Sequence, residues 1–353
     1  MTLYNVSSLT MSSRMIKYIQ DENNDLNRLN IENATGKHAD MALSVGAQAG
    51  TAASLKNDFY YAERLDLSNS QTEMKLDVSY QAVDTIRNNA EAFRSQMIGV
   101  RDTGGAIITL SQLANTEMSS LTSVMNSSAG GVYLFGGENV SSGPMQEFED
   151  AAKASIEAAF NTHFGFPITD GAQTSNITEA DMQIFLDDVF NDEASATNEF
   201  SAANWTANWS GATDGVMSAN IETGVDIETT LSANDQAFKE LAKAYAMVGL
   251  IGTADLSPEV EAVVIENSVA AITTGIDGVN FIQTKIGARQ QRLELAEKSL
   301  ETRMTTLNIR INDIENVDPN EVAVRLRDTQ DQLETNYAIT ARLNNLSLLN
   351  FLR

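Results

Sequence analysis

Cysteine is absent from this chain of 353 residues. Disulfide bonds, thiolate nucleophiles and cysteine-ligated metal sites are therefore excluded. Proline occurs only 4 times, and aromatic residues make up only 7 % of the sequence. Hydrophobic residues still reach 42 %, which is enough for a packed core. Because helix seams can be built from Leu, Ile, Val, Ala and Met, this composition favours long helices.

Basic residues are scarce, and the formal net charge is −25. Nucleic acid and anionic membrane surfaces, which need a basic face, are therefore not expected as partners. Between Arg101 and Lys239 there are twenty Asp and Glu residues against one basic residue, Lys153. We interpret this stretch as a solvated acidic surface.

Long apolar runs are also missing. No stretch of about 18 consecutive apolar residues occurs, so no membrane insertion is expected. The N-terminus, Met1-Thr2-Leu3-Tyr4-Asn5-Val6-Ser7-Ser8, has no basic start followed by an apolar core. It therefore does not match a conventional cleaved secretory signal.

The motifs of enzymes are not found. The two histidines, His38 and His163, lie 125 positions apart and form no H-E-x-x-H pair. No G-x-S-x-G element or phosphate-binding glycine loop occurs. Acidic pairs such as Asp187-Asp188 could act as acid and base, but such runs usually line a solvated helix face. The sequence predicts no catalytic residue, no metal site and no cofactor.

Two heptad patterns, one in each half of the chain, are the main positive signal. Apolar residues recur every seven positions, which keeps one stripe facing a partner helix. The positions expected to form the seam of the helical rod are Leu76, Val83, Ala90, Leu293, Leu300 and Leu307. Helix starts are expected at Ser257-Pro258 and at Asp318-Pro319, where Asp318 would cap and Glu321 would close a capping box.

Neither heptad arm can bury its seam alone, so we expect the two arms to pair antiparallel. The predicted fold is mainly α, a long antiparallel coiled-coil rod made from both chain ends. A smaller mixed α/β head domain is inserted between the arms. The expected segments are an N-terminal assembly segment 1–50, a helical arm 51–130, an acidic head 131–235, a returning arm 236–316 and a C-terminal assembly helix 317–353.

The chain ends are more apolar than one slim rod can bury. The residues predicted to contact other subunits are Leu3, Val6, Leu346, Leu348, Leu349, Phe351 and Leu352. Burial of each such side chain is worth about 1.5–3 kcal/mol, which could drive polymerisation. The alternative is that both ends fold back onto their own rod. A different class, a surface-binding module that stacks Trp205 and Trp209 on a partner, also stays open, although we favour a core position for both.

The sequence resembles the flagellin and hook-associated protein family along its whole length. The resemblance is carried by Val132-Tyr133-Leu134-Phe135-Gly136-Gly137, by Ser232-Ala233-Asn234-Asp235-Gln236-Ala237-Phe238 and by the tail from Tyr337 to Leu352. Within the family, the tail looks like that of the hook–filament junction protein. The stretch Ala34-Thr35-Gly36-Lys37-His38-Ala39-Asp40 departs from the usual filament flagellin pattern.

The resemblance implies a structural subunit that connects hook to filament, with a divergent filament flagellin as the alternative. It implies self-association, contacts with other hook-associated proteins and flagellin, and a flagellar export chaperone that covers the C-terminal helix. It further implies type III export without a cleaved signal peptide and an extracellular location in the flagellum.

Overall fold

A computed structural model describes residues 8–103 and 107–351 of the chain. The chain divides into two compact units. Unit 1 comprises residues 1–64 and 300–353, and unit 2 comprises residues 65–299. Long helices from both halves of the sequence dominate and strands are few, so the mainly α prediction is confirmed. The five predicted segments concern assembly roles as well as structure, and they remain a prediction.

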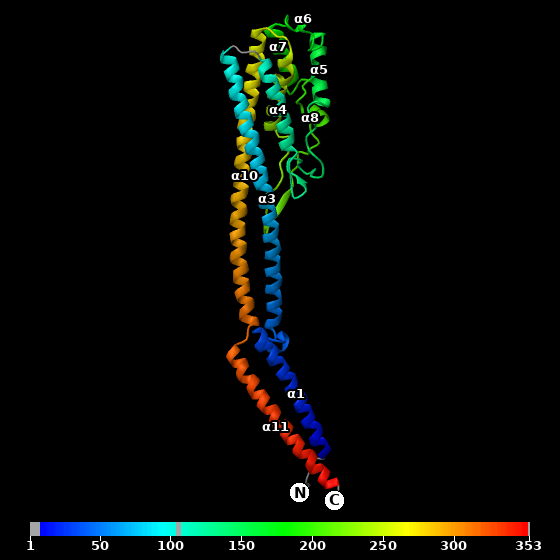
Figure 1. The fold of residues 1–353 in the computed structure, drawn as a ribbon, viewed down its shortest axis with the longest axis vertical. Helices are drawn as coiled ribbons and strands as arrows, with labels where there is room; N and C mark the ends of the chain where they lie inside the picture. The colour runs from blue at the N-terminus through cyan, green and yellow to red at the C-terminus, as the bar shows by residue number, and fades with distance from the viewer. Residues whose placement is uncertain (1–7, 104–106, 352–353) are drawn as a thin grey trace. The chain divides into compact units, whose positions relative to one another are not determined.

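Helices α3 and α10 contribute to both units, while α1, α2 and α11 belong to unit 1 (Figure 1). Their bounds are α1 (Ser8–Thr35), α2 (Met41–Val45), α3 (Gln48–Thr103), α10 (Pro258–Glu315) and α11 (Pro319–Phe351). The remaining elements lie in unit 2. They are α4 (Ile108–Met125), β1 (Ser128–Ala129), β2 (Val132–Tyr133), α5 (Ala151–Phe164), α6 (Gly171–Thr174), α7 (Glu179–Leu186), the π-helical turn η1 (Asp187–Asn191), α8 (Ala202–Asn208), β3 (Ser218–Glu222), β4 (Val225–Glu228), α9 (Gln236–Leu250) and the 3₁₀ turn η2 (Ile251–Thr253).

Within unit 2, α3 and α10 run antiparallel. Gln283 Nε2 donates to Asp84 Oδ1 at 3.0 Å. One heptad along, Gln290 Nε2 donates to Asp77 Oδ1 at 2.7 Å. Position numbers rise on one helix as they fall on the other, which is the register of an antiparallel pair. The two helices lie side by side in Figure 1.

The start of α10 follows its expected cap. Ser257 Oγ accepts the Val260 N–H at 3.4 Å, ahead of Pro258 at the first helical position. At α11, Asp318 Oδ1 accepts the Asn320 N–H at 2.8 Å, as a capping side chain does. The expected capping box is wrong in one part. Within the described residues, the Glu321 carboxylate lies 3.8 Å from Arg325 one turn ahead, and no bond to the Asp318 N–H forms.

The core of unit 2 is continuous. It joins buried side chains of α3, α4, α9 and α10 with those of the inserted residues between β1 and β4. Helix α9 packs against both α4 and α10, and Gly275 and Gly278 of α10 lie directly against it. Almost every side chain of α9 is buried, including Phe238 and Tyr245. The insert therefore shares its hydrophobic core with the neighbouring helices.

Two short antiparallel hairpins organise the inserted residues. Ser128 pairs with Tyr133 and Ala129 with Val132, across a two-residue turn at Gly130 and Gly131. Both glycines have positive φ, 60° and 80°, as that tight turn requires. A second antiparallel hairpin joins β3 to β4. Helix α7 continues directly into η1.

Among the described helices, α10 is long and apolar enough to span a membrane, judged by length and composition alone. An 18-residue window of α10 has a mean hydropathy of 1.2, and 44 % of that window is buried inside the protein. Val264, Ile272 and Ile276 of this helix are buried in the core of unit 2. Packing against the rest of the protein accounts for the apolar composition of α10, as it does in core helices of soluble proteins.

Candidate assembly surface

Helices α1 and α11 lie along one another in unit 1 (Figure 1). Polar contacts tie them together midway. Asn336 Nδ2 donates to both carboxylate oxygens of Glu22, at 2.7 and 2.8 Å. Asn23 Nδ2 lies 3.4 Å from the hydroxyl of Tyr337. Apolar burial between these helices is sparse, because Leu29 of α1 and Val322 of α11 are the buried hydrophobic residues that their described parts contribute.

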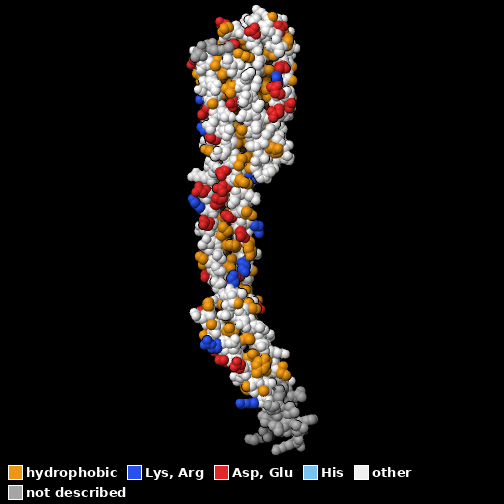
Figure 2. Space-filling view, viewed as in Figure 1, with side chains coloured by type: hydrophobic (Ala, Val, Ile, Leu, Met, Phe, Trp, Pro, Cys, Tyr) orange, Lys and Arg blue, Asp and Glu red, His pale blue; other side chains and the backbone are white. Residues whose placement is uncertain are grey.

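Large hydrophobic side chains of these helices face solvent instead. We call the following seven residues the apolar surface of unit 1: Met11, Ile16, Tyr18, Ile31, Val324, Tyr337 and Ile339. Each of them is at least 40 % exposed. Figure 2 shows hydrophobic side chains spread over the surface of this unit. Because all seven lie on two paired helices, these residues are candidates for contacts with a neighbouring molecule.

The predicted subunit contacts fall near the two ends of the sequence. Leu3, Val6 and Leu352 lie outside the described residues. The backbone of α11 runs through Leu346, Leu348, Leu349 and Phe351, but their side chains also lie outside the described part of the structure. None of the seven residues of the apolar surface of unit 1 was among these predicted contacts. The sequence patterns pointed to the chain ends and missed most of this surface. In the sequence, the exposed apolar residues of α11 look like the buried stripe of an ordinary amphipathic helix.

A buried carboxylate joins the turn after α1 to the end of α10. Glu315 is 4 % exposed, and it forms ion pairs with Lys37, at 3.1 Å, and with Lys56 of α3. Two backbone bonds run beside it. The His38 N–H donates to Glu315 O at 2.9 Å, and the Val317 N–H donates to Gly36 O at 3.0 Å. We call this arrangement the Glu315 clamp.

Electrostatics favour the ionised form of the clamp carboxylate. Burial works to raise the pKa of Glu315, but hydrogen bonds and charges from Lys56 and Lys37 outweigh it, so the pKa is lowered from its ordinary value. Lysine partners so far away in the chain leave no local pattern, since Lys37 lies 278 positions from Glu315. The clamp therefore could not be identified from the sequence.

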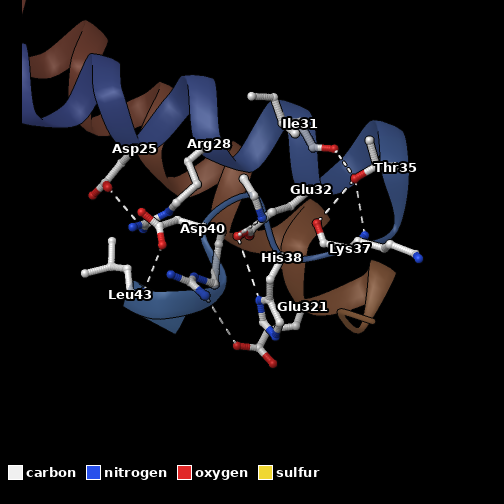
Figure 3. Close-up of polar contacts among 12 residues, drawn as sticks. Asp25, Arg28, Ile31, Glu32, Thr35, Lys37, His38, Asp40, Leu43 and Glu321 are labelled. Carbon is white, nitrogen blue, oxygen red and sulfur yellow. Dashed lines mark hydrogen bonds and ion pairs between the residues drawn. The ribbon is translucent and has the colours of Figure 1, made fainter. Parts of the chain in front are cut away.

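The loop between α1 and α2 is fixed by further polar contacts (Figure 3). Glu32 Oε1 accepts the Ala39 N–H at 3.2 Å and lies 3.9 Å from His38 Nδ1. Asp40 caps α2 by accepting the Leu43 N–H at 3.0 Å. His38 is thus part of a structural turn.

The six residues predicted for the helix seam are all buried. Leu76, Val83, Ala90 and Leu293 are at most 1 % exposed in unit 2. Leu300 and Leu307, which belong to unit 1, are 1 % and 8 % exposed. Asn69, Thr72 and Ser79 of α3 are buried as well, so the buried stripe of this helix is partly polar.

The histidine and aspartates considered for metal binding or acid–base catalysis do not gather in one site. His163 contacts the rings of Phe164 and Phe185 at 4.7 and 5.5 Å between centroids. Asp187 accepts hydrogen bonds from Gln183 and Asn191 at the protein surface. Among the described residues, no group of three or more His, Asp or Glu side chains is placed to hold a metal ion.

Both tryptophans lie in the core. Trp205 and Trp209 are 0 % and 1 % exposed and stack with ring centroids 5.2 Å apart. This placement agrees with the core position that we favoured. It removes the stacking platform on which the surface-binding alternative depended, because the indole faces already pack against each other and against Phe200.

Comparison with known proteins matches both helical ends. Residues 6–140 match the bacterial flagellin N-terminal helical region, and residues 269–352 match the bacterial flagellin C-terminal helical region. Together the two matches span more than half of the chain. No curated protein matches the sequence.

A solved structure shares the fold. It is described as that of a "putative flagellar hook-associated protein" from Vibrio parahaemolyticus, with a TM-score of 0.52 and 11 % sequence identity. The similarity covers 77 % of this chain and 99 % of that one. At this identity the likeness concerns the fold alone.

Proposed function

The chain belongs to the flagellin family, as a structural subunit of the bacterial flagellum, and from that premise we propose that it is the hook–filament junction protein. In this role it forms part of a tube in which its terminal helices pack against those of sister molecules and of neighbouring hook-associated proteins and flagellin. It acts as a mechanical connector and carries out no reaction.

The observation that carries the proposal is the apolar surface of unit 1. A helix pair that leaves Ile16, Val324 and Tyr337 at least half exposed has burial energy still to gain. Full burial of such a side chain is worth about 1.5–3 kcal/mol, and roughly half of that remains to be gained when a neighbour covers it. Contacts repeated along a tube therefore supply the free energy of assembly.

The terminal residues complete that surface in our proposal. Leu3 and Val6 at one end of the chain, and Leu346, Leu348, Leu349, Phe351 and Leu352 at the other, are assigned to the inner layer of the tube. Before assembly such a tail would aggregate. We therefore propose that an export chaperone covers α11 and that the chain leaves the cell unfolded by type III export, without a cleaved signal peptide.

The choice of the junction role over a divergent filament flagellin rests on two stretches. The tail ends in Leu348-Leu349-Asn350-Phe351-Leu352, which resembles the junction protein. The stretch at residues 34–40 lacks the filament flagellin pattern, and here it forms the turn that the Glu315 clamp holds. If the chain is a filament flagellin, many copies of it should lie along the filament. If it is the junction protein, its copies should form a short band beside the hook.

The test is a paired substitution in the tail, with immunogold labelling of the native protein. Leu348→Ser with Leu349→Ser should abolish assembly and motility, while the secreted protein remains a folded monomer. Asn344→Ser with Asn345→Ser, in the same helix, should leave both unchanged. Gold confined to the hook–filament boundary supports the junction role, and gold along the filament replaces it with the filament role. Normal assembly of the leucine variant would refute the assembly proposal altogether.

A further inference from the structure

A cavity of about 420 Å³ lies in the inserted part of unit 2. Its walls come from α5, η1, the loop at 196–199 and the first turn of α8. Helices α5 and α8 lie against each other there (Figure 1). The volume falls at the small end of the range typical for small-molecule sites, which is about 300–1,000 Å³.

The wall of the cavity holds a buried carboxylate. Glu199 is only 7 % exposed. Asn208 Nδ2 donates to Glu199 Oε2 at 3.4 Å, and Ser155 supplies a second hydrogen bond. Among the described residues no lysine or arginine forms an ion pair with Glu199. Burial raises the pKa of Glu199 against the opposing effect of these two donors.

The remaining polar lining is also rich in acceptors. Asp188, the hydroxyls of Thr162 and Thr197, and the ring of His163 border the same space. The Thr162 hydroxyl donates to Ala158 O at 2.8 Å, which leaves its oxygen lone pairs available to a ligand. None of the described lining residues is a lysine or arginine. The buried Glu199 and the exposed Asp188 thus border the same space, and its described lining residues supply no cationic side chain from lysine or arginine.

We propose that this cavity binds a small organic cation through its ammonium group, with Glu199 as the counter-ion. A buried carboxylate without a cationic partner is costly even when neutral donors hydrogen-bond it, and an entering cation replaces the solvation that burial removed. An alkylammonium carries three N–H donors, which can be shared between Glu199, Asp188 and a threonine hydroxyl. A metal ion fits less well, because the described residues provide no cluster of three ligands.

The site is independent of the assembly role. Every residue in it belongs to unit 2, whereas the apolar surface and the Glu315 clamp belong to unit 1. Loss of binding would therefore not affect the proposed flagellar function, and a failure of that proposal would not touch the cavity.

The experiment compares n-butylammonium chloride with n-butanol, a neutral ligand of similar shape, by calorimetry on the full chain. The native protein should bind the cation and not the alcohol. Glu199→Gln keeps the shape and removes the charge, and it should weaken binding roughly ten- to hundredfold. The matched control is Glu147→Gln, which removes the same charge from an exposed residue outside the cavity and should bind as the native protein does.

Three results would overturn the proposal. One is equal binding of butanol and butylammonium, and another is equal affinity of the Glu199→Gln and Glu147→Gln variants for butylammonium. The third is binding that disappears when salt is raised, because a buried charge pair is screened far less than an ion atmosphere at the surface. Tryptophan emission from the buried Trp205 and Trp209 confirms that each variant is folded.

Discussion

Ala237 occupies the space that a side chain at Gly278 would need. A Cβ atom added at Gly278 would fall 2.6 Å from the Cβ of Ala237, well inside contact distance. A Cβ atom added at Gly275, one turn earlier on α10, would likewise fall 2.6 Å from Cδ2 of Leu241 on α9. The two glycines therefore set how closely α9 approaches α10 in the core of unit 2.

Gly278→Ala is accordingly expected to destabilise unit 2. The added methyl group must push α9 away, and such overpacking typically costs about 1–3 kcal/mol. The control is Gly287→Ala on the same helix, where an added Cβ meets nothing within 4 Å. That substitution should stabilise by roughly 0.5–1 kcal/mol, since alanine is the better helix former. Urea unfolding of both variants measures the two signs, and equal signs would contradict the packing described.

Glu315→Gln should loosen unit 1 at neutral pH. The substitution removes the charge that Lys37 and Lys56 bind, and hydrogen bonds to charged groups are worth about 1.5–3 kcal/mol. Glu321→Gln, which breaks only the exposed pair with Arg325, should change stability by less than about 1 kcal/mol. Guanidinium or urea unfolding, followed by limited proteolysis near residue 37, reports the effect.

Acid should abolish the contribution of the same clamp. The folded pKa of Glu315 lies below its ordinary value of 4.5, so the stabilisation is fully present above pH 4.5. It is lost as pH falls through the lower folded value. On acidification from pH 6 to below the folded pKa of Glu315, the free energy of unfolding should therefore fall more for the native protein than for Glu315→Gln. Parallel pH profiles for the two proteins would show that the clamp does not form in solution.

Substitutions at two nearby residues of α1, Leu29 and Ile31, should distinguish an effect on folding from an effect on assembly. Leu29 is 2 % exposed, and Leu29→Ala should cost about 2–5 kcal/mol of stability. Ile31 is 53 % exposed, and Ile31→Ala should change stability by less than about 0.5 kcal/mol. Because Ile31 belongs to the apolar surface of unit 1, its truncation should instead weaken co-sedimentation with flagellar fragments. Unaltered co-sedimentation would remove Ile31 from the interface.

The stacked tryptophans differ in how their N–H groups are satisfied. Trp205 Nε1 donates to Asn234 Oδ1 at 3.1 Å, whereas Trp209 Nε1 is buried without a partner among the described residues. Both replacements by phenylalanine lose apolar area. Trp205→Phe also leaves Asn234 short of a donor, so it should cost roughly 1 kcal/mol more than Trp209→Phe. Urea midpoints compare the two, and the reverse order would contradict these hydrogen-bond assignments.

Sequence patterns predicted the helices well because their signals are local. The heptads placed Leu76, Val83 and Leu293 on stripes that are buried in the structure. The cap at Ser257 depends on residues within one turn, and it formed as expected. The capping box at Glu321 was wrong, since the exposed Glu321 carboxylate lies beside Arg325 instead, at 3.8 Å.

The amino-acid sequence by itself determined that this chain is a mainly helical protein with paired heptad arms and apolar ends, since periodicity and composition act over neighbouring residues. Only the tertiary structure decided which charges are buried. Glu315 found two lysines and Glu199 found none, although both are glutamates without a distinguishing local pattern. Desolvation and pairing depend on which distant segments fold against a residue, and that information appears only when the helices have packed.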